Sequence, residues 1–235
     1  MIRMAMTRTA ALLLGAFILG VGCSSAPAVH ADRLKERPLR GSAVLLIDPD
    51  VRLFEKTSSG EYDFRVDWTR AAERVVMHEL VDQLNNRRMD LVAYEMPPPG
   101  SGRDHDLQIV RLHSAVSEAI LAHHLSSDRR LPSKQGKLDW TLGPGVAQLK
   151  GVRKANYVLL VCLRDSYSAA SRGLAGVFGS EMKPMPGEQW GFVSLVEKET
   201  GDIVWCNRLP KGVGDLREEE PARQAVKALL ERFPL

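Results

Sequence analysis

The chain has 235 residues, of which 44% are hydrophobic, 26% charged and 6% aromatic, with a formal net charge of +3 and three cysteines. This composition is that of a globular protein and excludes a disordered, collagen-like or polytopic membrane chain. A charge of +3 without a basic run or an RNA-binding signature argues against a nucleic-acid partner. Three cysteines are too few for a disulfide scaffold.

The first 22 residues are typical of an export signal. Arg3 and Arg8 supply a positive start, and the uncharged apolar run over residues 10–21 is shorter than the roughly 20 residues that a membrane-spanning helix needs. The run ends in small residues before Cys23, which resembles a bacterial lipobox. The resemblance implies cleavage before Cys23, lipid on that residue, and, with Ser24 behind it, an address at the periplasmic face of the outer membrane. An ordinary signal peptide cleaved a few residues later is the alternative.

Residues 23–40 contain two prolines and alternating charges, which predicts a flexible tether, and one folded domain is expected over residues 41–235. Its first strand is predicted over residues 41–53, interrupted by Asp48-Pro49-Asp50. A helix with Asp67 as its N-cap follows, then a short strand over residues 91–94. A second helix starts at Asp106, and its inward side chains are expected to be Ile109, Leu112, Val116, Ile120 and His123.

The second half of the chain continues the alternation. A short helix is predicted over residues 145–152 and a strand over residues 156–163, followed by a long loop rich in small residues over 166–187. Residues 189–196 and 203–209 predict a β-hairpin, and Pro221 starts a last helix. The pattern predicts an α/β fold, a single-domain sandwich with a mixed β-sheet flanked by helices and with a C-terminal β-hairpin and helix.

Two segments carry a resemblance to known families. Residues 154–160 resemble the entry into a central strand, and residues 192–205 resemble the hairpin, of the curli-secretion (CsgG-type) and TolB-N-terminal-like envelope lipoproteins. The segments 140–143, 163–167 and 204–207 resemble a family of uncharacterised bacterial lipoproteins. The resemblance implies an envelope protein, and it says more about the fold than about the activity.

The end of the strand at residues 156–163 carries the candidate binding residues. Arg164, Asp165, Tyr167 and Arg172 could anchor an acidic or peptide-like partner, or Arg164 and Asp165 could form an ion pair that fixes the loop. Within that loop, apolar Leu174 and Phe178 suggest contact with a partner, another subunit or the membrane surface, with burial against the chain's own sheet as the alternative.

Cys162 and Cys206 fall in two predicted strands. If the strands are neighbours and the side chains share a face, a disulfide is geometrically allowed. Two free, buried thiols are the other reading.

No complete catalytic or metal-binding set is recognisable in the sequence. Ser166, Ser168 and Ser171 follow a strand, but a hydrolase would need a histidine from the second helix. His78 and Asp82 are spaced for one metal but lack a third ligand. The glycine pairs lack the pattern of phosphate loops, so we expect no cofactor and no metal.

The sequence thus predicts a non-catalytic, lipid-anchored accessory or interaction protein of the cell envelope, acting in assembly, secretion or cell-wall maintenance. Its expected partners are the membrane, through the anchor, and an envelope protein, with homo-oligomers allowed. The alternatives are a periplasmic serine hydrolase and a ring-forming secretion subunit.

Overall fold

A computed structural model of the protein describes residues 28–31, 34, 39, 41–126, 129–168 and 189–234. The strands are β1 Val29–His30, β2 Ala43–Leu46, β3 Asp50–Lys56, β4 Tyr62–Phe64, β5 Asp90–Ala93, β6 Tyr157–Ser168, β7 Trp190–Glu197 and β8 Ile203–Arg208. The α-helices are α2 Val66–Asn86, α3 Arg103–His123 and α5 Glu219–Leu229. Short 3-10 helices are η1 Pro132–Lys134, η2 Pro144–Gln148 and η3 Val152–Lys154.

The described strands form one open, mixed sheet in the order β1-β8-β7-β6-β2-β5, with β3 beside β6 and β4 beside β3. Strand β6 is long enough to pair with two strands in succession. Its residues 157–159 lie parallel to β2, and its residues 162–168 lie parallel to β3. Between β2 and β3 the chain passes through Pro49, which has no N–H to donate to a sheet. The predicted first strand is therefore two strands, and β2 ends partway along β6.

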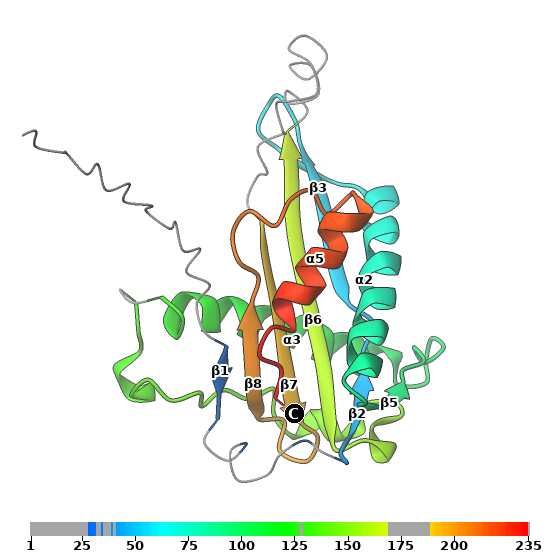
Figure 1. The fold of residues 1–235 in the computed structure, drawn as a ribbon, viewed down its shortest axis with the longest axis vertical. Coiled ribbons are helices and arrows are strands. Elements are labelled where there is room, and N and C mark those ends of the chain that lie inside the picture. The colour runs from blue at the N-terminus through cyan, green and yellow to red at the C-terminus, as the bar shows by residue number, and fades with distance from the viewer. Residues whose placement is uncertain are drawn as a thin grey trace, which may run out of the picture.

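Helices cover both faces of this sheet. Helices α2 and α5 lie on one face and α3 lies on the other (Figure 1). Successive side chains of β6 point to opposite faces: Val161 and Leu163 join the core under α2 and α5, whereas Leu160 and Cys162 join the core under α3. The predicted α/β sandwich with a mixed sheet, a C-terminal hairpin and a C-terminal helix is confirmed.

Helix α3 buries a more polar stripe than its sequence pattern suggests. The prediction that Leu112 points inward is wrong, since Leu112 is 41% exposed. The buried residues of the helix are Asp106, Ile109, His113, Ser117 and Ile120. Hydrogen bonds offset the desolvation of the polar ones: Tyr94 Oη donates to Asp106 at 2.9 Å, and Ser117 Oγ donates to the backbone oxygen of His113 at 2.7 Å.

Helix α2 begins at Val66, one residue before its predicted cap. Arg65 occupies the N-cap position without a side-chain hydrogen bond to the helix, so the expected capping by Asp67 is not seen. Asp67 lies instead in the first turn, where its carboxylate faces the positive end of the helix dipole, and it accepts a hydrogen bond from Arg65 Nε at 3.3 Å.

The predicted hairpin of β7 and β8 is confirmed. Its turn contains Gly201 at a φ of +75°, in the region that favours glycine. A Cβ at Gly201 would lie 1.9 Å from the carbonyl oxygen of Gly143, and the backbone N–H of Leu142 donates to the Gly201 oxygen at 2.8 Å. Residues 140–143 and the hairpin turn, which both carry the family resemblance, are therefore packed backbone against backbone.

Strand β8 also holds the C-terminal helix, which starts at Glu219, two residues before its predicted start. The side-chain amide of Asn207 donates hydrogen bonds to three carbonyl oxygens at the end of α5, those of Ala228, Leu229 and Glu231, at 3.2, 3.0 and 3.3 Å. Carbonyls at and just after the last turn of a helix lack the full set of partners inside the helix, although the Ala228 oxygen also accepts from the backbone N–H of Glu231 at 3.2 Å. The segment 204–207 therefore has a structural purpose, which is to close this helix onto the sheet.

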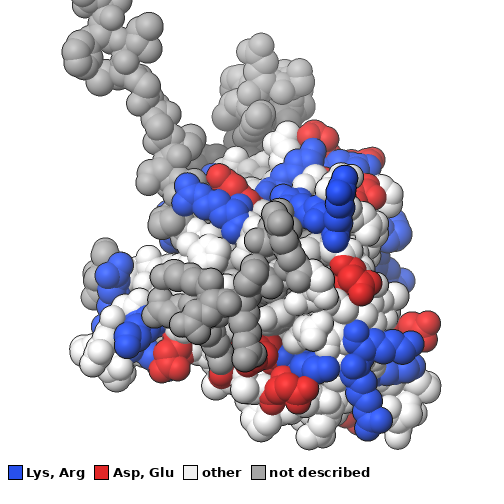
Figure 2. Space-filling view, turned by 60° about the horizontal axis from the view of Figure 1, so that its bottom comes forward, with Lys and Arg blue, Asp and Glu red and all other residues white. Residues whose placement is uncertain are grey.

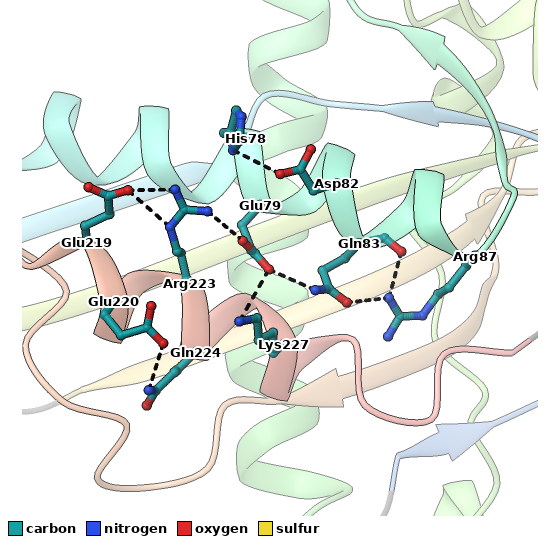
Figure 3. Close-up of polar contacts among 10 residues, drawn as sticks. All are labelled: His78, Glu79, Asp82, Gln83, Arg87, Glu219, Glu220, Arg223, Gln224 and Lys227. Carbon is teal, nitrogen blue, oxygen red and sulfur yellow. Dashed lines mark hydrogen bonds and ion pairs between the residues drawn. The ribbon is translucent and has the colours of Figure 1, made fainter.

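A polar network joins α5 to α2 on their facing sides (Figure 3). Its centre is Glu79 of α2, whose side chain is 5% exposed. The carboxylate accepts hydrogen bonds from Arg223 at 3.1 Å and from Gln83 at 2.9 Å. Lys227 Nζ lies 4.0 Å from it. The network orients α5 over the sheet.

The fold begins before the expected boundary at Gly41. The two residues of β1 pair antiparallel with β8, and Leu34 and Leu39 are 6% and 1% exposed. This part of the predicted tether is packed against the fold, because β8 offers free backbone groups at its edge.

Charged side chains of both signs are interspersed over the face of the molecule shown in Figure 2. Within the part of the chain that the structure describes, no helix is both long and apolar enough to span a membrane.

Candidate functional site

A cavity of about 650 Å³ lies at the carboxyl end of β2. Side chains of α2 and α3 line it together with the link from β2 to β3. The apolar lining residues are Ile47, Pro49, Met77, Met96, Leu107 and Val110, and the charged or titratable ones are Asp48, Asp50, Glu73, Arg74 and His78. A cavity of this size and apolar character, with a few polar groups, is typical of a small-ligand site. The carboxyl ends of parallel strands are also where α/β proteins bind ligands.

Two carboxylates of the cavity, those of Asp48 and Glu73, lack a directly bonded partner among the residues that the structure describes. Neither Asp48 nor Glu73 accepts a hydrogen bond or forms an ion pair with a described residue. Burial raises the pKa of Asp48. Burial together with the negative charges of Asp50 and Asp48 raises the pKa of Glu73, against the weaker opposing attraction of Arg70 and Arg74. Of the three cavity carboxylates, these two are therefore the ones without a direct ion pair in the described part of the chain, since Asp50 is paired.

The third carboxylate, that of Asp50, is held by arginine. Arg164 of β6 forms a short ion pair with it and also donates to Ser114 Oγ of α3 at 3.0 Å. Arg52 Nε donates to the same carboxylate at 3.2 Å. Both Arg164 and Asp50 have side chains that are 12% exposed. Arg164 thus fixes the link after β2 through Asp50, rather than the loop after β6 through the predicted ion pair with Asp165.

The alternative ion pair between Arg164 and Asp165 is not formed, because consecutive residues of a strand point to opposite faces. Asp165 is buried on the other face, where it accepts hydrogen bonds from Tyr167 Oη at 2.5 Å, from the Gln189 side chain and from the backbone N–H of Ser166. Burial raises its pKa to about 6. Tyr167 in turn accepts a hydrogen bond from the backbone N–H of Leu216 at 2.7 Å.

The predicted binding residues therefore belong to two separate clusters. Arg164 is paired with Asp50, and Asp165 is bonded to Tyr167. Arg164 and Asp165 also line a smaller hollow of about 280 Å³, with Phe54, Tyr62, Glu118, Ser166 and Trp190. The remaining predicted residues, Cys23, Arg172, Leu174 and Phe178, lie outside the described residues.

The two strand cysteines are free and buried. Cys162 lies opposite Phe192 of β7, and Cys206 lies opposite Ser194 on the other side of the same strand. Because β7 separates them, their Cα atoms are about two strand spacings, roughly 10 Å, apart, which exceeds the reach of a disulfide. The condition for the bond, neighbouring strands, is not met.

The polar stripe of α3 includes a buried histidine beside a serine. His113 Nε2 lies 2.6 Å from Ser194 Oγ, and the two residues are 1% and 0% exposed. Burial lowers the pKa of His113 to about 3. This pair has no access to a substrate, so it is a structural contact between α3 and β7.

The hydrolase reading needed a histidine of α3 beside Ser166 or Ser168. His105 bonds the backbone oxygen of Gly145 at 2.9 Å, and His123 bonds that of Arg129 at 3.0 Å. Together with His113, these histidines are oriented toward other partners. The geometry gives that reading no support.

His78 Nδ1 lies 3.2 Å from Asp82 Oδ2 on the exposed side of α2 (Figure 3). Among the described residues, no three His, Cys, Asp or Glu side chains lie close enough together to hold a metal ion.

Sequence reasoning missed the cavity but contained a signal for it. Asp48-Pro49-Asp50 directly follows a fully buried strand, and charged residues at the carboxyl end of a parallel strand are candidates for ligand binding. Glu73 and Met77 fall within the predicted helix and carry no signal of their own, and His78 is a candidate only as a metal ligand together with Asp82.

No protein-family model matches the chain, and no curated protein matches it significantly. Solved structures with some likeness include the PelC dodecamer from Paraburkholderia phytofirmans, at 12% identity and a TM-score of 0.34, covering 83% of this chain and 91% of that one. A single-substitution variant of that dodecamer has 14% identity with the same coverage and TM-score. A TM-score of 0.34 carries no conclusion about fold or function.

Proposed function

We propose that the protein is a non-catalytic, lipid-anchored accessory protein of the cell envelope that works by binding. The observation that carries the binding role is the open, largely apolar cavity at the end of β2. The candidate binding residues predicted at the end of β6 are held within the fold, as Arg164 is by Asp50 and Asp165 is by Tyr167. Neither pair sets an accessible nucleophile beside a base, which is the arrangement that covalent catalysis requires.

The envelope location is supported by the sequence alone. Arg3 and Arg8, the apolar run and Cys23 make up a lipoprotein signal. The resemblance of the β7–β8 hairpin to curli-secretion and TolB-N-terminal-like lipoproteins points to the same compartment. A lipid on Cys23 would hold the domain at the periplasmic face of the outer membrane without a spanning helix.

Metabolic labelling with palmitate tests the anchor. We expect label on the wild-type chain, none on Cys23→Ala, and undiminished label on the matched variant Cys206→Ala, whose thiol is buried in the sheet. On membrane fractionation, the wild-type chain should sediment with the outer membrane and Cys23→Ala should be released. Label that persists in Cys23→Ala would contradict the proposal.

A further inference from the structure

We infer that the cavity at the end of β2 binds a primary ammonium group attached to an apolar body. The inference deepens the proposed function by naming the class of ligand. It rests on the binding role and is independent of the lipid anchor.

The charges of the lining residues favour a cation. Three carboxylates, those of Asp48, Asp50 and Glu73, face one guanidinium, that of Arg74. Asp50 is already paired with two arginines of β3 and β6. Asp48 and Glu73 form no direct hydrogen bond or ion pair with a described residue. The negative charges of Asp50 and Asp48 act on Glu73 more strongly than the attraction of Arg70 and Arg74, so they add to the effect of burial in raising the pKa of Glu73. A cation between them would relieve this repulsion and restore the interactions lost on partial burial.

The kind of cation follows from the acceptors. Carboxylates bind N–H donors through short charge-assisted hydrogen bonds, and an ammonium group offers three such donors. The lining contains no Phe, Tyr or Trp ring, so it lacks the aromatic cage that selects quaternary ammonium ions. A primary ammonium therefore suits the site better than a methylated one.

The apolar body follows from the walls. Met77 and Met96 can adapt their shape to a ligand because their side chains are unbranched, and Leu107 and Val110 of α3 add apolar side chains to the lining. Burial of each CH₂ group against such walls contributes about 0.8 kcal/mol. A ligand with an aliphatic chain would thus use both halves of the cavity.

Isothermal titration of the full chain with n-hexylamine hydrochloride at pH 7 tests the inference, with hexanoate and hexan-1-ol as probes of the same length. We expect saturable binding of hexylammonium, and binding of the other two at least about tenfold weaker, because neither supplies a cation. The double variant Asp48→Asn/Glu73→Gln should bind hexylammonium about tenfold or more weakly. A matched double variant, Asp90→Asn/Glu231→Gln, removes two carboxylates outside the cavity and should bind as the wild type does.

A second variant tests the apolar part of the cavity without changing any of its charged residues. Val110→Phe places a larger side chain in the cavity and should also weaken hexylammonium binding, with circular dichroism confirming that each variant is folded. Equal affinity of the wild type and Asp48→Asn/Glu73→Gln would overturn the inference, as would preferred binding of hexanoate through Arg74. Preferred hexanoate binding would leave the binding role intact, and absence of any binding would contradict that role as well. Palmitate labelling reports on the anchor separately.

Discussion

His113 is a single side chain whose burial makes the stability of the fold depend on pH. Its ring is fully buried beneath α3 and lies 2.6 Å from Ser194 Oγ. Burial lowers its pKa from 6.5 to about 3, so the folded state favours the neutral ring whereas the unfolded chain takes up a proton below pH 6.5. Stability from this residue is therefore fully present above about pH 6.5 and is lost as the pH falls toward 3.

Replacing His113 by Gln should flatten the acid limb of the stability curve. Over the full interval from pH 6.5 to 3, protonation of His113 accounts for about 4 to 5 kcal/mol of the free energy of unfolding. Urea unfolding at a series of pH values should show that the wild type loses more stability than His113→Gln between pH 6.5 and 4. Equal losses would contradict the assignment.

For Asp165 we expect the opposite dependence of the free energy of unfolding on pH. Burial raises its pKa from 3.8 to about 6, so its protonated form is favoured in the folded state and its contribution is greatest below about pH 4. The free energy of unfolding of the wild type, minus that of Asp165→Asn, should fall by about 2 kcal/mol between pH 4 and pH 7. A difference that stays constant or rises over this interval would show that the Asp165 carboxylate is not strained by burial.

Among the elements, the contact between α2 and α5 depends on one buried carboxylate. Glu79 is 5% exposed and contacts Arg223, whereas Glu219, which contacts the same arginine at 2.6 Å, is 66% exposed. A buried charge left without its partner costs far more than an exposed one.

Glu79→Gln should therefore destabilise the protein by about 1 to 3 kcal/mol. The matched variant Glu219→Gln, on the same arginine, should cost less than about 0.5 kcal/mol. Chemical unfolding of both variants at pH 7 measures the difference. Similar losses in the two variants would mean that the network in Figure 3 does not hold the helices together.

The elements themselves could be predicted from the sequence far better than their contacts. Apolar periodicity placed α2 and the hairpin, because local patterns specify them. The buried face of α3 could not be predicted, since the partner that accounts for burying His113 is Ser194, 81 residues away. The cavity could not be predicted either, because it lies where β2 ends, partway along the longer strand β6.

At the scale of the whole molecule, the sheet keeps its two strand cysteines apart and inaccessible. Burial raises the pKa of both Cys162 and Cys206 to about 12, so neither thiol ionises at neutral pH, and the thiolate is the reactive form. In the native protein both should resist iodoacetamide, and in denaturant without reductant both should be alkylated, as peptide mapping by mass spectrometry would show. Peptides joined by a disulfide between them would contradict the strand order.

The whole-molecule account rests on the cavity at the end of β2 as the place where this protein binds. Hydrogen–deuterium exchange of the full chain, with and without hexylammonium, tests this most directly. Ligand should slow exchange at residues 47–50 and 73–78, which line the cavity, and leave the hairpin turn at Gly201, outside it, unchanged. Protection at other segments only, or none at saturating ligand, would contradict the account.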